Sequence, residues 1–128
     1  MRFKGRFETT TKTCVRLLLI NWKPNLGGMY SLSNVINNPA DNRGIVSGYN
    51  EDTAGSFKIL YDKVITVLPD RHKIVNVRKK IGVNVLYSGT GGAQTDISHN
   101  NVIWCMLTDS NGGSLSIWHT LKSWYSDA

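Results

Sequence analysis

Short strand-like segments separated by clusters of turn-forming residues constrain the fold of this chain more than any other feature of its sequence. Six segments read as β-strands, because apolar residues in them alternate with polar ones or run together over a few positions: FKGRFETT, TCVRLLLINW, SFKILYDKVITVL, KIVNVRKKIGVNVLY, NVIWCMLT and SLSIWHTLKSWY. Gly, Asn, Pro and Asp gather between them, as in KPNLGG, NNPADNRG and SGTGGAQ. The pattern predicts an all-β domain, an antiparallel sandwich or barrel. One helical turn is expected at SLSNVINN, capped by Ser31 or Ser33.

The segment FKILYDKVITV, residues 57–67, is a strand with charges in its middle. Its apolar residues at positions 57, 59, 61, 65 and 67 share one side of an extended chain. Lys58, Asp62 and Thr66 lie on the other side, while Lys63 interrupts the apolar row.

Length and composition indicate one globular domain covering residues 1–128. A chain of 128 residues can enclose a hydrophobic core. Its 41% hydrophobic and 19% charged residues are typical of neither a disordered tail nor a membrane protein, and the longest apolar run, Leu17–Ile20, is too short to cross a bilayer. No secretory signal is recognised at the N-terminus, so we expect synthesis inside the cell. Cys14 and Cys105 lie in apolar segments, which favours two free buried thiols over the alternative of a disulfide.

The positive charge is concentrated in the first part of the chain. Residues 1–80 hold 14 Lys and Arg against 6 acids, a balance of +8, whereas residues 81–128 hold one Lys against three Asp, a balance of −2. A basic front part favours a polyanionic partner, because each base that meets a phosphate releases counterions. The alternative is an ordinary solvated basic surface.

Two basic clusters carry this charge. MRFKGRF places Arg2, Lys4 and Arg6 on one side of a strand and leaves Phe3 and Phe7 for packing, as a phosphate-contacting strand requires. RHKIVNVRKK holds five bases, with Arg78, Lys79 and Lys80 in sequence, so that either the strand bulges there or the cluster lies at its end. A charged sheet edge that blocks aggregation is the alternative role, and the two roles can coexist.

The last strand segment presents two tryptophans on one side. Trp118 and Trp124 alternate with the apolar positions 115, 117, 121 and 125 and share their side with Thr120 and Lys122. Exposed aromatic residues among polar groups indicate a binding surface. The alternative is that a second sheet covers them.

Motifs for catalysis or metal binding are weak or absent in the sequence. His72, His99 and His119 fall on separate segments without ligand spacing. GTGG at residues 89–92 lacks the spacing of a phosphate loop and is read as a turn, and no nucleophile elbow occurs. We therefore expect no enzymatic activity, no metal and no cofactor.

The order of the segments resembles a family of viral proteins. CVRLLLINWKPNLGGMYSLSNVI, then SFKILYDKVITV, then a basic strand ending in VLYSG, then NNVIWCMLTDS and a final KSWYSD follow one another over nearly the whole chain. In this order and spacing the chain resembles the capsid proteins of small circular, replication-initiator-encoding single-stranded DNA viruses, the geminivirus-like and circovirus-like ones. The segment SFKILYDK, residues 56–63, carries the closest similarity.

The resemblance implies an eight-stranded antiparallel jelly roll that self-assembles into a small icosahedral shell around single-stranded DNA. It implies a virion protein, present in the host nucleus or cytoplasm during assembly, with no membrane partner. The family's Arg-rich arm and first strand do not precede FKGRF here, so one sheet is expected to have an open edge that another chain or segment covers. Asp62, Lys63, Trp118 and Trp124 are then expected at subunit interfaces.

The residues expected to face nucleic acid form two groups. The first lies nearest the position of the family's arm, which points into the shell, and the second has the densest charge; together they are Arg2, Lys4, Arg6, Lys12 and Arg16, with Arg71, Lys73, Arg78, Lys79 and Lys80. The second group is alternatively a contact with an acidic loop such as Glu51-Asp52 of a neighbouring subunit. The alternative function is a small non-viral β-barrel module that binds single-stranded nucleic acid.

Overall fold

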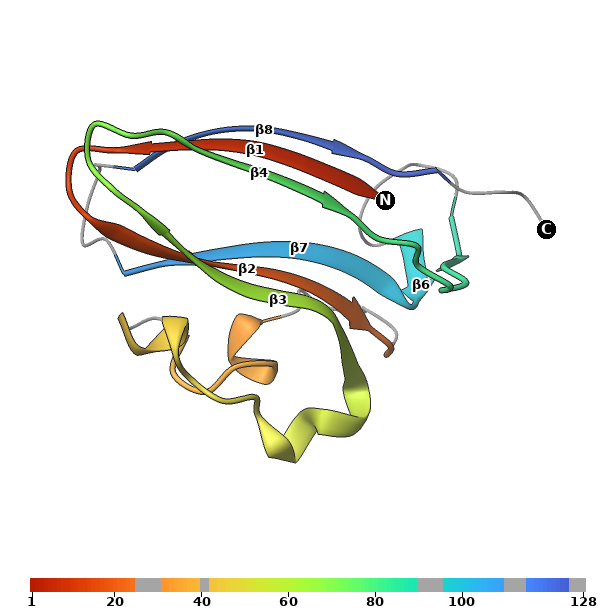
Figure 1. Cartoon of the computed structure of the whole chain (residues 1–128). Coiled ribbons are helices and arrows are strands. Elements are labelled where there is room, and N and C mark those ends of the chain that lie inside the picture. Colours follow the sequence, from red (N-terminus) through yellow and green to blue (C-terminus); the bar gives the residue numbers. More distant parts are fainter. Residues whose placement is uncertain (25–30, 40–41, 90–95, 110–114, 125–128) are drawn as a thin grey trace. The chain divides into compact units, whose positions relative to one another are not determined.

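The regular structure of the chain consists of β-strands and a few short 3-10 helices (Figure 1). The computed structural model describes residues 1–24, 31–39, 42–89, 96–109 and 115–124. In these residues the elements follow in the order β1 (Arg2–Thr9), β2 (Thr13–Trp22), η1 (Leu32–Asn34), η2 (Asn42–Ile45), η3 (Glu51–Ser56), β3 (Phe57–Val67), β4 (Lys73–Arg78), β5 (Leu86–Tyr87), β6 (Ile97–His99), β7 (Asn101–Thr108) and β8 (Leu115–Lys122). The predicted all-β class is confirmed.

The chain forms two compact units, each built from separate stretches of sequence. The first unit comprises Met1–Cys14, Thr66–Gly82 and the described part of Ser110–Ala128, and the second comprises the described parts of Val15–Ile65 and Val83–Asp109. In the first unit β1 lies between β4 and β8 and pairs antiparallel with both (Figure 1). This sheet carries the candidate site.

Strand β1 separates an apolar face from a basic face by simple alternation. Phe3 and Phe7 are buried on one side, next to Val75 and Val77 of β4. Gly5 lies between the two phenylalanines, and a Cβ there would come within 2.8 Å of the Phe3 ring and 2.9 Å of the Phe7 ring. The absence of a side chain at position 5 therefore lets both rings pack over the strand.

Gly5→Val is expected to lower the free energy of unfolding by about 2 kcal/mol, because overpacking a filled core forces buried rings off their rotamers. Urea unfolding measures the change. Lys4→Val, a substitution on the exposed face of the same strand, should alter stability by no more than about 0.5 kcal/mol. An equal change in the free energy of unfolding in the two variants would contradict this account of Gly5.

In the second unit β2 lies between β3 and β7 and is buried along most of its length. A run of apolar residues on both faces is what such a central strand requires. One face of β2 joins the turn region of η1 in a cluster made of Leu18, Ile20, Trp22, Val35, Ile36 and Phe57. Two further strands, β5 and β6, pair with each other in a small separate sheet.

Several local predictions can be compared with the observed elements. The segment 73–87, predicted as one strand, ends as β4 at Arg78, so the basic cluster lies at a strand end rather than in a bulge. Just beyond this strand end, the Lys79 N–H donates to the Met1 carbonyl oxygen at 3.0 Å. A single turn of helix does form at Leu32–Asn34, but the Ser31 side chain makes no capping hydrogen bond.

The described residues form eight strands, which are arranged in three sheets. Each of the two larger sheets has three strands, and β5 and β6 stand apart from both. Cys14 and Cys105 are not joined by a disulfide, and both are only half-buried rather than buried as expected. Within the described ranges no helix is long and apolar enough to cross a membrane, and no group of three His, Cys, Asp or Glu residues could hold a metal ion.

Candidate nucleic-acid interface

The exposed face of the β4-β1-β8 sheet gathers five cationic side chains. Residues directly opposite one another on paired antiparallel strands share a face of the sheet. Arg2 pairs with Arg78 on one side and Lys122 on the other, and Lys4 pairs with Asn76 and Thr120. Two positions further along, Arg6 lies between Ile74 and Trp118. We call Arg2, Lys4, Arg6, Arg78 and Lys122 the basic face.

Three of these cations form one row across the sheet. Arg78, Arg2 and Lys122 are direct neighbours on three adjacent strands. Like charges directly opposite one another destabilise a sheet. Among the described residues no carboxylate forms an ion pair with any of the three, and the Arg2 side chain donates from Nε to the Asn76 Oδ1 at 3.2 Å. The fold keeps this unfavourable row without neutralising it, which makes it a candidate anion site.

The far end of the basic face is less charged and more apolar. Arg6 is ion-paired with Glu8 on the same strand. Beside Arg6, Trp118 is 57% exposed and Ile74 is 58% exposed. An exposed indole next to cationic side chains can stack on a nucleobase while a cationic side chain binds the neighbouring phosphate. The alternative, that a second sheet covers Trp118, does not agree with this exposure.

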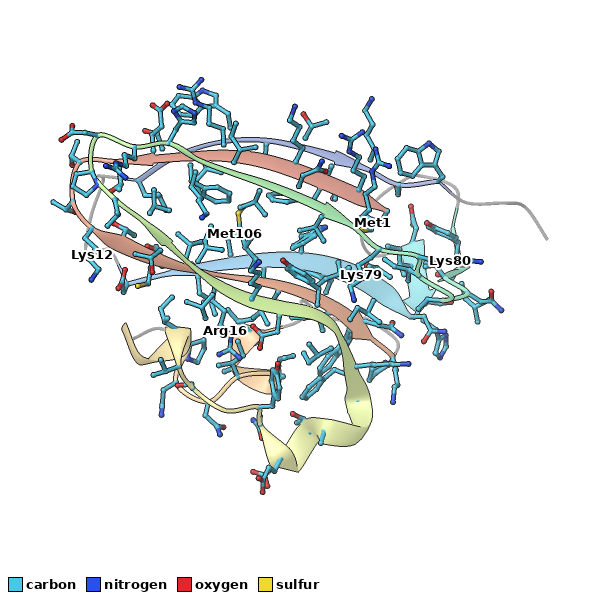
Figure 2. The ribbon with its side chains drawn as sticks, viewed as in Figure 1. Met1, Lys12, Arg16, Lys79, Lys80 and Met106 are labelled. Atoms are coloured by element: carbon cyan, nitrogen blue, oxygen red, sulfur yellow. The ribbon has the colours of Figure 1, made fainter. Side chains whose placement is uncertain are left out.

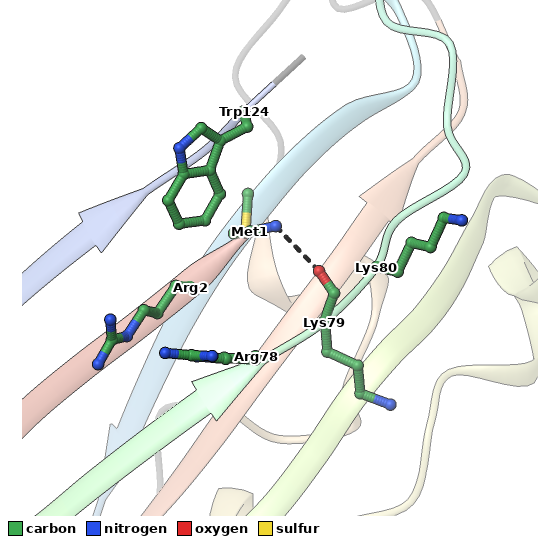
Figure 3. A pocket seen from close by; sticks show the side chains of 6 residues that line it. All are labelled: Met1, Arg2, Arg78, Lys79, Lys80 and Trp124. Atoms are coloured by element: carbon green, nitrogen blue, oxygen red, sulfur yellow. Dashed lines mark hydrogen bonds between the residues drawn. The ribbon is translucent and has the colours of Figure 1, made fainter. Parts of the chain in front are cut away.

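A pocket of about 460 Å³ lies at the other end of the basic face, where β1 begins. Met1, Arg2, Arg78, Lys79, Lys80 and Trp124 line it (Figure 3). Figure 3 shows the Arg2 and Arg78 side chains extending to the same side, with Trp124 beside Met1, whereas Lys79 points away from the two arginines. The backbone here is held by the Met1 amino group, which donates to the Lys79 carbonyl at 2.9 Å.

The other predicted nucleic-acid residues do not join the basic face. Lys12 is exposed in the turn between β1 and β2 (Figure 2). Lys73 pairs with Phe7 and so belongs to the opposite side of the sheet from Arg6. Arg71 lines a second pocket, of about 320 Å³, together with Glu8 and Asp70. The acids in that pocket make it a poorer phosphate site than the first.

Arg16 was predicted to face nucleic acid, and this is wrong. Its side chain is 7% exposed and makes hydrogen bonds within the second unit (Figure 2). Nε donates to Asp62 Oδ1 at 2.9 Å and Nη2 to Asp62 Oδ2 at 2.6 Å, while Nη1 donates to the Gly44 and Ser47 carbonyls at 2.9 and 2.7 Å. Four of its five N–H donors are thus used inside the chain, and its burial keeps a phosphate away from the guanidinium.

The same contacts correct the role of Asp62, which was expected at a subunit interface. Its carboxylate accepts two hydrogen bonds from Arg16 and a third from the Tyr49 hydroxyl. The centre of the Tyr49 ring lies 5.6 Å from the Arg16 guanidinium carbon. The charge in the middle of β3 is therefore matched inside the chain. Lys63 is exposed beside it, and its expected place at an interface stays a prediction.

Lys122 belongs to the basic face but was not among the residues predicted to face nucleic acid. It is the only base after residue 80 and so adds nothing to the basic clusters. Its sequence signal is its position on the same side of the last strand as Trp118. The pairing of β8 with β1 turns that position into a place beside Arg2.

The chain was compared with protein-family models and with curated proteins, and neither comparison gave a match.

Proposed function

We propose that the chain is a coat-protein subunit that self-assembles and holds single-stranded DNA on the basic face. The observation that carries the proposal is the row of Arg78, Arg2 and Lys122 across three strands, with Lys4 next to it. Phosphate contacts of this kind supply affinity without sequence preference. A shell that packages a genome requires binding of that type.

The exposed aromatics favour a single strand over a duplex. Trp118 and Trp124 can stack only on bases that have left a duplex stack, and such stacking tolerates any base. Alternate residues along β1 are about 7 Å apart, so the basic face offers charges at regular steps along an extended chain. Single-stranded nucleic acid matches this repeated arrangement of cation and indole.

Self-assembly is supported by the uneven burial of the apolar face of the first sheet. Val75 and Val77 of β4 are each 8% exposed, and Phe3 of β1 is 2% exposed, yet Leu121, opposite Phe3 on β8, is 45% exposed. The apolar face is thus buried at Phe3, Val75 and Val77 and exposed on β8 at Leu121, while Leu115 and Ile117 of β8 are half-buried. The β4 edge carries Lys73 and Arg78, which repel another strand, whereas β8 carries only Lys122. We propose that a second copy of the chain covers the β8 side.

The order of the strands supports the jelly-roll part of the proposal. The chain passes from β1 in one sheet to β2 and β3 in the other, returns for β4, and later adds β7 and β8 to the two sheets in turn. A jelly roll has this alternation and a fourth strand in each sheet. In the proposed assembly, contacts between subunits complete the open side.

The purified chain is expected to form large uniform particles at micromolar concentration, seen by electron microscopy and size-exclusion chromatography, and to retain nucleic acid measured by absorbance. A monodisperse monomer of 14.3 kDa in ordinary salt would contradict the assembly. Such a monomer that still binds oligo(dT) would instead identify the alternative, a small single-stranded nucleic-acid-binding module.

A further inference from the structure

We infer that the pocket lined by Arg2, Arg78 and Trp124 is a subsite for one nucleotide unit, with a phosphate on the two guanidinium groups and the base on the indole. This inference rests on the proposed function and assigns the class of ligand to one end of the basic face. The pocket volume of about 460 Å³ lies in the range of small-molecule sites.

The phosphate position follows from the two arginines. Arg2 and Arg78 are direct cross-strand neighbours and extend to the same side (Figure 3). Their mutual repulsion is relieved by an anion between them, and the planar fork of each guanidinium matches phosphate oxygens. Arg2 already gives its Nε hydrogen to Asn76, which fixes the guanidinium while its terminal nitrogens are left for a ligand.

The base position follows from Trp124. Its side chain is 68% exposed, two residues beyond the end of β8, and its indole borders the same pocket as the arginines (Figure 3). An indole that is mostly in water leaves a flat apolar face, which a flat partner can cover by stacking. A nucleobase is such a partner, and the phosphate of the same nucleotide reaches the arginines. An acidic peptide would satisfy the arginines and leave the indole uncovered.

A short probe separates this pocket from the rest of the basic face. Trp118 pairs with Arg6, four residues along β1 from Arg2, which is about 13 Å in a strand. A 5′-phosphorylated thymidine dinucleotide occupies the pocket without engaging Trp118. We expect it to quench tryptophan fluorescence equally in the wild-type chain and in Trp118→Leu.

In Trp124→Leu the dinucleotide affinity should fall roughly 5- to 150-fold, the usual effect of losing one stacked base, and most of the quenching should disappear. Trp124 lies outside the strands and is largely exposed, so the variant should keep the fold. Arg78→Gln should instead lower the salt dependence of binding by about 0.7 in logarithmic slope and leave quenching of the bound state in place.

Three results overturn the inference. They are dinucleotide binding that is unchanged in Trp124→Leu, an equal loss in Trp118→Leu, and competition by inorganic pyrophosphate as effective as that by the dinucleotide. A longer oligo(dT) distinguishes this from failure of the proposed function. If the wild-type chain and Trp124→Leu bind the oligonucleotide equally well, only the subsite is wrong. If the wild-type chain binds neither the dinucleotide nor the oligonucleotide, the proposed nucleic-acid function is wrong as well.

Discussion

Asp62→Ala is expected to lower the free energy of unfolding by about 3 to 5 kcal/mol, the largest effect of any single substitution considered for this chain. Removing the carboxylate leaves the Arg16 guanidinium, whose side chain is 7% exposed, without its charge partner. A buried charge without a partner costs far more than the loss of a surface ion pair. Urea unfolding followed by circular dichroism measures the difference.

Lys63→Ala is the matched control, because it removes the next charge on the same strand from an exposed position. It should change stability by no more than about 0.5 kcal/mol. A loss below about 1 kcal/mol in Asp62→Ala would show that the pair with Arg16 does not hold the second unit together.

Acid should reveal the same ion pair. Burial acts to raise the pKa of Asp62, but the hydrogen bonds from Arg16 and Tyr49 and the Arg16 charge outweigh it and hold this pKa below its ordinary value of 3.8. A carboxyl with a lowered folded-state pKa contributes stability that is complete above its unfolded pKa and is lost as the pH falls through the folded one. Wild-type stability should therefore fall below about pH 4 more steeply than that of Asp62→Asn.

Lys4→Gln combined with Lys122→Gln is expected to weaken oligo(dT) binding about 15-fold at roughly 0.15 M salt, with assembly unaffected. Each lost phosphate contact on a single strand removes about 0.7 from the salt slope, which corresponds to about fourfold in affinity at this salt concentration. Both lysines are exposed on the basic face, and neither belongs to the pocket with Trp124. Fluorescence anisotropy of a labelled oligonucleotide gives the affinities.

Lys58→Gln combined with Lys63→Gln removes the same number of lysines from exposed positions of β3. This control keeps the net charge equal to that of the first double variant. If both double variants bind equally weakly, net charge rather than the basic face governs binding. Retained affinity in the β3 variant alone supports the basic face.

The alternation of residues in the sequence was enough to predict the two faces of β1. Phe3 and Phe7 are buried and Lys4 and Arg6 are exposed, because a strand has a strict two-residue period and the two kinds of side chain differ strongly in hydration. The same reasoning placed Trp118 opposite the apolar positions of the last strand but left open whether a second sheet covers it; Trp118 is 57% exposed. These features depend only on neighbours within one strand.

Features that depend on pairing between distant segments could not be predicted. Arg16 looked like one more base of the first cluster, although its position inside a continuous apolar run was a signal of burial. Its partner, Asp62, lies 46 positions later, and only the pairing of β2 with β3 in one sheet brings them together. In the same way, Lys122 becomes part of the basic face only through the pairing of β8 with β1.

The most direct test of the central claim is the salt dependence of oligo(dT) binding, measured from about 0.05 to 0.5 M for the wild-type chain and for both double variants. Binding through the basic face predicts a steep logarithmic slope for the wild type, a slope shallower by about 1.4 for Lys4→Gln with Lys122→Gln, and an unchanged slope for Lys58→Gln with Lys63→Gln. The claim is contradicted if the basic-face variant keeps the wild-type slope, or if the wild-type chain does not bind the oligonucleotide at the lowest salt.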